Sequence, residues 1–274
     1  MINILKSELK RSIFNKWTLI AMMIIMCFGI KHFMGMYDSR MEYIRYVEEA
    51  GYGNAVNVCS GTAYEYWIMF DFNMYKIVIL FIMPILSVLP FGMSYYSDVK
   101  SGYIKQIVSR MSMKTYTRAK YIATFISGGL AVTLPLFIQF LLTATIFPLH
   151  KPDRFACAMV GQYCFDVDLF YEHPMIFTLF RLMLIFVVAG LLATVSLLVS
   201  KYIYNYFSVF ITPFVVSFML EFSVYITGMN WISFSNNLRA ESQIVESYTA
   251  LLIEIVVLFA ATYFGFVSSK KEVY

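Results

Sequence analysis

The sequence predicts an all-α membrane protein with six transmembrane helices, an N-terminal interfacial helix and a short cytoplasmic helix. Apolar residues make up 60% of the chain and charged residues only 14%, whereas a soluble domain is about 25% charged. The apolar residues occur in blocks of about 20 or more, which is the length that a helix needs to cross the hydrocarbon core. Residues 1–274 are therefore expected to form a single transmembrane domain.

Residues 1–16 predict a helix that lies at the membrane interface. One helical face carries apolar residues, namely Ile2, Leu5, Leu9 and Ile13. The segment also carries basic residues with a single acid, namely Lys6, Lys10, Arg11, Lys16 and Glu8. The apolar run 17–36 is longer than the roughly 7–15-residue core of a signal peptide, and it ends without a small-residue cleavage pattern. We expect it to be retained as the first span.

The five further spans follow from the remaining apolar blocks. They are expected at about 74–95, 121–147, 174–200, 206–226 and 248–267. Prolines inside them should kink the helices, at Pro84, Pro90, Pro135 and Pro213. Polar outer loops separate the first and second spans and the third and fourth. The first outer loop ends in aromatic residues that predict an interfacial belt, namely Tyr64, Tyr66, Trp67, Phe70 and Phe72.

Ionisable residues within or near the spans are costly there and usually functional. Lys31, Lys76 and Arg181 lie near span ends, and we expect their charged groups to extend to the interface. Glu221 and Glu254 lie in the outer halves of spans five and six. They are candidates for lining a substrate path, where they would favour a cationic or amphipathic substrate. The alternative is pairing inside the bundle.

The distribution of Lys and Arg predicts the orientation, because cytoplasmic segments are enriched in both. With six spans the two termini share a side with residues 97–120 and 201–205. The basic residues on that side are Lys6, Lys10, Arg11, Lys16, Lys100, Lys105, Arg110, Lys114, Arg118, Lys120, Lys201, Lys270 and Lys271. The acids there are only Glu8, Asp98 and Glu272. We expect a multi-pass plasma-membrane protein with both termini in the cytoplasm.

A basic amphipathic segment separates the second and third spans. A helix over about 97–113 would place an apolar stripe on one side, formed by Tyr103, Ile104, Ile107, Val108 and Met111. Such a helix either lies on the anionic inner leaflet or docks its stripe into a groove of a cytoplasmic partner. We favour docking.

Four cysteines are present. Cys27 falls inside the first span, and Cys59, Cys157 and Cys164 fall in outer segments, so one disulfide can form there. Cys157–Cys164 is the nearest of three pairings, and the spacing does not choose among them. The spacing is unlike that of a zinc site.

Sequence motifs for nucleotide binding and for zinc-dependent catalysis are absent from the chain. No GxxxxGK[ST] phosphate loop and no HExxH motif occur. The three histidines, His32, His150 and His173, are expected at the outer side, which argues against an intramembrane protease. We therefore expect no catalytic, metal-binding or cofactor-binding residues in this chain.

Two stretches carry a family resemblance. INILKSELKRSIFNKWT precedes and opens the first span, and SDVKSGYIKQIVSRMSMKTYTRAKYI joins the second to the third. The second stretch has an acid, Asp98, then Gly102, a basic helix, a Ser/Thr/Tyr turn and Lys120 at the start of span three. This layout resembles the permease subunit of ATP-binding-cassette (ABC) exporters of the type-2 permease family. The outer segment between spans five and six is shorter than in many members of that family.

The resemblance implies that residues 97–113 form a coupling helix that contacts a separate ATPase. The coupling residues would be Asp98, Gly102, Tyr103, Ile104, Ile107, Val108 and Met111. Two ATPase subunits would carry the ATP and Mg²⁺, and a second permease chain would complete a homodimer or heterodimer. Membrane lipid, but not nucleic acid, is a further expected partner. The alternatives are a six-span transporter or channel without an ATPase and, less favoured, an intramembrane enzyme.

Overall fold

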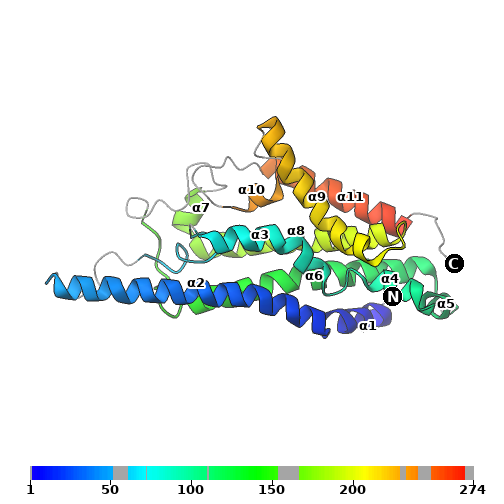
Figure 1. The fold of residues 1–274 in the computed structure, drawn as a ribbon, viewed down its shortest axis with the longest axis horizontal. Coiled ribbons are helices and arrows are strands. Elements are labelled where there is room, and N and C mark those ends of the chain that lie inside the picture. The colour runs from blue at the N-terminus through cyan, green and yellow to red at the C-terminus, as the bar shows by residue number, and fades with distance from the viewer. Residues whose placement is uncertain are drawn as a thin grey trace.

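The computed structural model describes residues 2–51, 61–71, 73–109, 111–153, 167–228, 233–239 and 248–268. These residues form helices and turns without any strand, which confirms the all-α prediction. The helices are α1 (Ile2–Ile13), α2 (Lys16–Glu49), α3 (Met74–Val88), α4 (Ser94–Lys100), α5 (Tyr103–Val108), α6 (Met113–Thr143), α7 (Val167–Glu172), α8 (Pro174–Ser200), α9 (Tyr206–Thr227), α10 (Phe234–Leu238) and α11 (Tyr248–Tyr263), which runs into a π-helical turn (Phe264–Ser268). Figure 1 shows an elongated bundle with α1, α4 and α5 together at one end, which we call the basic end.

Five helices are long and apolar enough to cross a membrane, as expected of a multi-pass membrane protein. They cover Lys16–Glu49, Met113–Thr143, Pro174–Ser200, Tyr206–Val224 and Thr249–Ser268. These segments correspond to the first, third, fourth, fifth and sixth predicted spans.

The second predicted span, 74–95, is not one continuous helix. α3 has only 15 residues, or about 22 Å at 1.5 Å per residue, and the chain then turns before α4 begins. Pro90 lies in this turn, where its missing N–H cannot continue a helix. The side-chain amide of Asn15 donates a hydrogen bond of 2.9 Å to the carbonyl oxygen of Pro90. The turn is thus held against the start of α2.

The centre of the bundle is the contact between α6 and α8, which are its most buried long helices. Two glycines allow this close approach. A Cβ atom at Gly128 would lie 2.5 Å from the Cβ atom of Ala193. A Cβ atom at Gly190 would lie 2.7 Å from the backbone oxygen of Phe125. Small residues at such contacts are typical of helix packing in membranes.

Helix α2 is longer than its predicted span, 17–36. It has 34 residues, about 51 Å at 1.5 Å per residue, and projects beyond the bundle (Figure 1). The residues after 36 were expected to begin a polar loop. They contain no proline, and Gly51 with a φ of 73° follows the end of the helix. The polar residues after position 36 therefore indicate exposure to water and do not end the helix.

Three aromatic residues of the first outer loop lie in the core and not in an interfacial belt, whereas Tyr66 is partly exposed. Tyr64, Trp67 and Phe70 are 5%, 0% and 2% exposed. The indole N–H of Trp67 donates a hydrogen bond of 3.1 Å to the backbone oxygen of Leu136 on α6. Phe72 is outside the described residues. Residues 61–71 therefore enter the bundle, where buried carbonyl groups satisfy the polar part of the indole ring.

The basic residues near the span ends also differ from expectation. Lys31 is exposed, but Lys76 and Arg181 are 0% and 1% exposed. Arg181 donates a hydrogen bond of 3.2 Å to the backbone oxygen of Asn237 in α10. Its guanidinium also lies over the ring of Phe177, 5.1 Å from the centroid. The short helix α10 supplies this acceptor inside the bundle, so Arg181 does not need to reach the interface.

Candidate functional site

The segment predicted as one helix over 97–113 forms two helices that meet at Gly102. Gly102 has a φ of 72°, in the left-handed region that glycine adopts without a Cβ penalty. The backbone therefore bends there, and α5 begins at Tyr103. The hydroxyl oxygen of Ser112 then caps α6 by accepting a hydrogen bond from the backbone N–H of Thr115. The unit is a helix–glycine–helix, which we call the α4–α5 unit.

The two isoleucines of the predicted apolar stripe are covered by the chain itself, whereas Tyr103 is 39% exposed. Ile104 and Ile107 are 4% and 8% exposed. They pack in one cluster with Tyr95, Tyr116, Tyr121, Leu197, Phe266 and Val267, and Val108 and Met111 lie partly buried at its edge. The expectation that a partner covers this stripe therefore needs correction for Ile104 and Ile107. The amphipathic pattern is satisfied within the bundle by α6, α8 and the end of α11.

The opposite face of the α4–α5 unit is exposed and basic. Its exposed residues are Ser97, Lys100, Ser101, Tyr103, Lys105, Gln106 and Ser109. We call this set the outward face of the unit. Any partner that contacts the unit from outside the bundle meets these residues.

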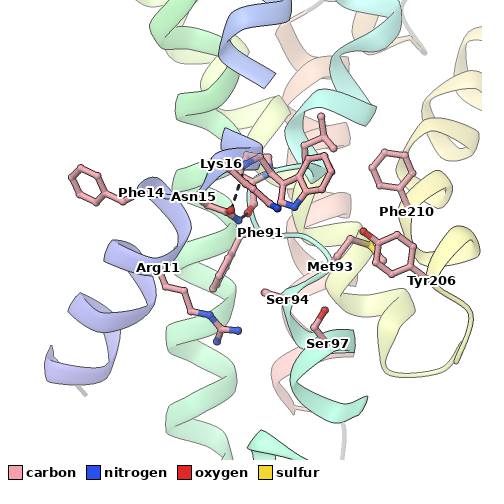
Figure 2. A pocket seen from close by; sticks show the side chains of 13 residues that line it. Arg11, Phe14, Asn15, Lys16, Phe91, Met93, Ser94, Ser97, Tyr206 and Phe210 are labelled. Atoms are coloured by element: carbon pink, nitrogen blue, oxygen red, sulfur yellow. Dashed lines mark hydrogen bonds between the residues drawn. The ribbon is translucent and has the colours of Figure 1, made fainter. Parts of the chain in front are cut away.

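A cavity of about 800 Å³ lies beside the unit at the basic end. It opens between the junction of α1 and α2, the turn before α4, and the start of α9 (Figure 2). Arg11 and Lys16 line it together with aromatic side chains that include Trp17, Tyr206 and Phe210. It combines cationic groups with an apolar wall.

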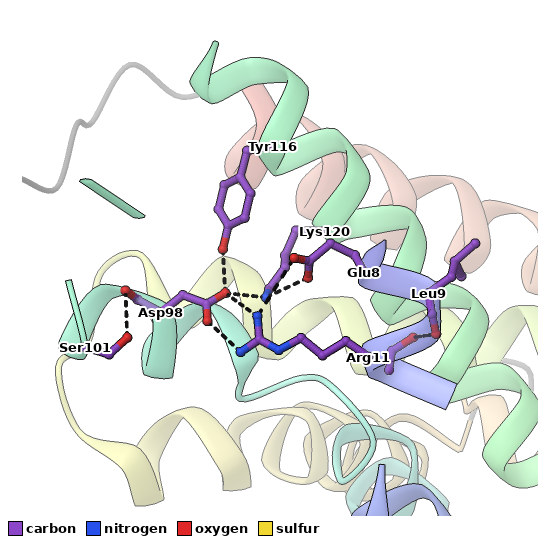
Figure 3. Close-up of polar contacts among 8 residues, drawn as sticks. Glu8, Leu9, Arg11, Asp98, Ser101, Tyr116 and Lys120 are labelled. Carbon is purple, nitrogen blue, oxygen red and sulfur yellow. Dashed lines mark hydrogen bonds and ion pairs between the residues drawn. The ribbon is translucent and has the colours of Figure 1, made fainter. Parts of the chain in front are cut away.

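A buried cluster of charges fastens the α4–α5 unit to α1 and α6 (Figure 3). Asp98 accepts hydrogen bonds of 2.8 Å from Arg11 Nη2, 2.6 Å from the hydroxyl of Tyr116 and 2.5 Å from Lys120 Nζ. Lys120 also lies 3.1 Å from Glu8 Oε2. Lys120 is 0% exposed, and Glu8 and Asp98 are 2% exposed each. We call these five residues the charge cluster.

The electrostatics of the cluster keep Asp98 ionised. Burial alone would raise the pKa of its carboxyl group, but the charge of Lys120 and the hydrogen bonds from Arg11, Lys120 and Tyr116 lower that pKa below its ordinary value. Burial alone would lower the pKa of Arg11, yet Asp98 and Glu8 raise it. Removing a buried member such as Asp98 or Lys120 typically costs about 3–5 kcal/mol, because it leaves an uncompensated buried charge, whereas the Arg11 side chain is 45% exposed and its removal costs less.

Sequence reasoning identifies Asp98 but misses its partners. A usable signal was present: Glu8 and Asp98 are each the only acid in a segment rich in Lys and Arg. Lys120, at the start of the third predicted span, was the corresponding signal for a basic partner. A buried acid and a buried base in one membrane protein are expected to pair.

The two candidate path residues lie on either side of α10. Glu221 accepts a short hydrogen bond from the hydroxyl of Ser233. It also lines a cavity of about 430 Å³ between α3, α8, α9 and α10, together with Arg239. Glu254 is 3.5 Å from the side-chain amide of Asn237 and is absent from that cavity's lining. Of the two glutamates, the described lining of this cavity contains Glu221 alone.

One of the three histidines is buried inside the bundle. His32 is 2% exposed, and its Nε2 is 2.9 Å from Asp71 Oδ2. Its Nδ1 is 3.3 Å from the side-chain nitrogen of Gln139, which also bonds Thr143. This network joins α2 and α6 to residues 61–71, and it holds no serine or cysteine nucleophile.

The cysteine predictions are mostly outside the described residues. Cys59, Cys157 and Cys164 fall there, so their pairing stays a prediction, while Cys27 on α2 is exposed with a free thiol. Among the described residues no group of three or more His, Cys, Asp or Glu side chains could hold a metal ion.

Comparison of the chain with protein-family models, with curated proteins and with solved structures finds no match. The functional argument therefore rests on the residues and their geometry.

Proposed function

We propose that this chain is the transmembrane subunit of an ABC exporter, and that a separate ATPase docks on the outward face of the α4–α5 unit. One observation carries the proposal. A short basic helix is displayed at the end of a membrane bundle and is fastened by buried charges to two other helices. A helix that only covered the bilayer surface would turn its apolar stripe to lipid, whereas Ile104 and Ile107 of this stripe are packed inside.

The course of the helices supports six crossings. In Figure 1, α2, α3, α6, α8, α9 and α11 run alternately away from and toward the basic end. We assign α3 and the turn after it to a short second crossing, flanked by the buried residues 61–71. Both ends of the chain then share the basic side, which the enrichment in Lys and Arg assigns to the cytoplasm of the plasma membrane.

The charge cluster supports a route for coupling. ATP and Mg²⁺ would bind to the ATPase, since this chain has no phosphate loop. A force on the unit reaches α1 through the Asp98–Arg11 pair and α6 through the Asp98–Lys120 pair. Because α6 packs along α8 at the centre, movement of the unit would shift the core of the bundle. Two such chains with two ATPase subunits would form the complete exporter, as a homodimer or heterodimer.

The test is recovery of an ATPase with the tagged chain from its native membrane. We expect an ATPase with a phosphate-loop motif to co-purify. Reversing the charge of the outward face with Lys105→Glu and Gln106→Glu should reduce its recovery by about tenfold or more, because like charges at an interface cost several kcal/mol. Both side chains are exposed, so folding of the bundle should be preserved.

The matched control is Lys151→Glu, an exposed lysine beyond the far end of α6. It should leave ATPase recovery unchanged. Equal ATPase recovery with the double variant would move the docking site elsewhere. If no ATPase is recovered even after cross-linking in the membrane, the proposal fails and a transporter or channel without an ATPase becomes the better description.

A further inference from the structure

The cavity at the basic end has the chemistry of a binding site for an anionic amphiphile. Two cationic side chains, Arg11 and Lys16, line it, and none of its described lining residues is acidic. Arg11 is already paired with acids, since its Nη2 and Nη1 donate hydrogen bonds of 2.8 Å and 3.4 Å to Asp98 and its Nη1 lies 3.8 Å from Glu8. Lys16 is exposed, and within the described part of the chain no carboxylate lies within ion-pair distance of it.

The backbone adds to this positive potential. Lys16 and Tyr206, both in the lining, are the first residues of α2 and α9. The aligned peptide dipoles give the N-terminus of a helix a partial positive charge, which favours an anion, and here the side chains of Asn15 and Asn205 already accept one N–H group of each helix. The hydroxyl groups of Ser94 and Ser97 also line the cavity and can donate hydrogen bonds. A phosphate group would find cationic groups and several hydrogen-bond donors here.

The other wall suits acyl chains. Trp17, Tyr206 and Phe210 line it with Leu89 and Met93 (Figure 2). Trp17 is 43% exposed and Tyr206 is 53% exposed, so the wall is open to its surroundings. The cavity lies where the amphipathic α1 meets the apolar α2, which we expect at the level of the lipid headgroups. A volume of about 800 Å³ is within the usual range for ligand sites, roughly 300–1,000 Å³.

We propose that this cavity binds one anionic phospholipid, with its phosphate at Lys16 and Arg11 and its acyl chains along Trp17 and Phe210. The inference requires only that this end of the bundle lies at a membrane face, and it is independent of the transport proposal. A free phosphate compound would offer the same charge but nothing for the apolar wall. The open aromatic wall therefore selects the lipid.

Trp17 provides the measurement. We would titrate the purified full-length chain in mixed micelles with phosphatidylglycerol or phosphatidylcholine whose acyl chains are brominated, and follow tryptophan quenching. The part of the tryptophan fluorescence that is lost in the Trp17→Phe variant comes from Trp17, and its quenching reports lipid bound in the cavity. Phosphatidylglycerol should quench this signal at about fivefold lower mole fraction than phosphatidylcholine, as expected for one basic residue near an anionic lipid.

Two lysine variants separate the site from general surface charge. Lys16→Glu should abolish the preference for phosphatidylglycerol. Lys114→Glu, which changes an exposed lysine at the same end but outside the cavity lining, should keep it. Elution of each variant at the wild-type volume in size-exclusion chromatography verifies folding, and Lys16→Gln replaces Lys16→Glu if the Glu variant fails to fold.

Equal quenching by both lipids in the wild type, or a preference for phosphatidylglycerol that survives loss of the Lys16 charge, overturns the proposal. Displacement of the lipid by millimolar glycerol 3-phosphate would assign the site to a soluble phosphate compound instead.

Discussion

Lys120 illustrates how single residues in this protein depend on partners from distant parts of the sequence. It is fully buried, yet Asp98 and Glu8 lie within ion-pair distance and the ring of Phe91 lies 4.3 Å from its ammonium group. The sequence could predict that a lysine opens the third span, but not that the lysine is buried. Burial follows only from the arrival of α1 and α4 at the same place.

Replacing Asp98 by Asn should destabilise the folded chain by about 3–5 kcal/mol near neutral pH, because Lys120 and Arg11 lose the acid between them. The pKa of Asp98 is lower in the folded protein than its unfolded value of about 3.9. Its contribution is therefore complete above that value and is lost as the pH falls through the folded pKa. Denaturant unfolding in detergent, repeated from neutral to acid pH, measures this difference.

The matched control is Asp38→Asn, which removes an exposed carboxylate of α2. It should change the free energy of unfolding by less than about 0.5 kcal/mol, as surface substitutions usually do. The difference between wild type and Asp98→Asn should narrow below about pH 4. A difference that is small, or that grows toward acid pH, would mean that the cluster is not held by an ionised Asp98.

At the scale of elements, periodicity predicts which segments are helical but not what covers them. The segment containing Ile104 and Ile107 is amphipathic whether its apolar side faces the groove of a partner or the chain's own core. Its pattern therefore could not distinguish these two possibilities. The same holds for Tyr64 and Trp67, since aromatic residues suit both an interface and a packed bundle. Gly102 was identified in the sequence, yet its left-handed backbone appears only in the structure.

Gly102→Ala tests whether the bend between α4 and α5 matters. An added Cβ would meet no atom within 4 Å, so only the backbone with a φ of 72° opposes it. We expect destabilisation of about 1–2 kcal/mol, the cost of a left-handed conformation for a non-glycine residue, measured by unfolding in detergent.

Gly35→Ala is the matched control, since Gly35 also has open space around it but lies inside α2. Alanine there should be neutral or stabilise by up to about 1 kcal/mol. Equal effects of the two substitutions would show that the backbone at Gly102 is not strained by alanine.

At the scale of the whole molecule, composition and block length are sufficient to predict a multi-pass helical bundle, and five helices of suitable length confirm that coarse prediction. The break after Val88 and the buried residues 61–71 could not be predicted, because they depend on partners such as Asn15 and Leu136 that are distant in the chain. Likewise, Glu221 and Glu254 looked equivalent in sequence, whereas the cavity between α3, α8, α9 and α10 is lined by Glu221 and not by Glu254.

That difference predicts distinct roles for the two glutamates, if the cavity is part of the substrate path. Glu221 and Arg239 line the same largely apolar cavity, in which Phe81, Phe214 and Phe218 supply aromatic surface. One acid and one base on an apolar wall suit an amphiphile that carries both a positive and a negative charge. Arg239 therefore changes the expectation from a cationic substrate to a zwitterionic one.

Lysophosphatidylcholine with a fluorescent acyl chain is a suitable probe, and its fluorescence anisotropy reports binding to the purified chain. Glu221→Gln should weaken binding by about tenfold, which corresponds to 1.4 kcal/mol.

Glu254→Gln is the comparison, because glutamine can still accept the hydrogen bond from Asn237 and Glu254 lies outside the cavity lining. It should leave both the yield of folded protein and probe binding unchanged, whereas Arg239→Gln should weaken binding as Glu221→Gln does. If Glu221→Gln lowers the yield while binding per folded molecule stays constant, Glu221 has a structural role through Ser233. Equal loss of binding in the Glu221 and Glu254 variants would also remove the cavity as the path, because the effect would then not depend on which carboxylate faces it.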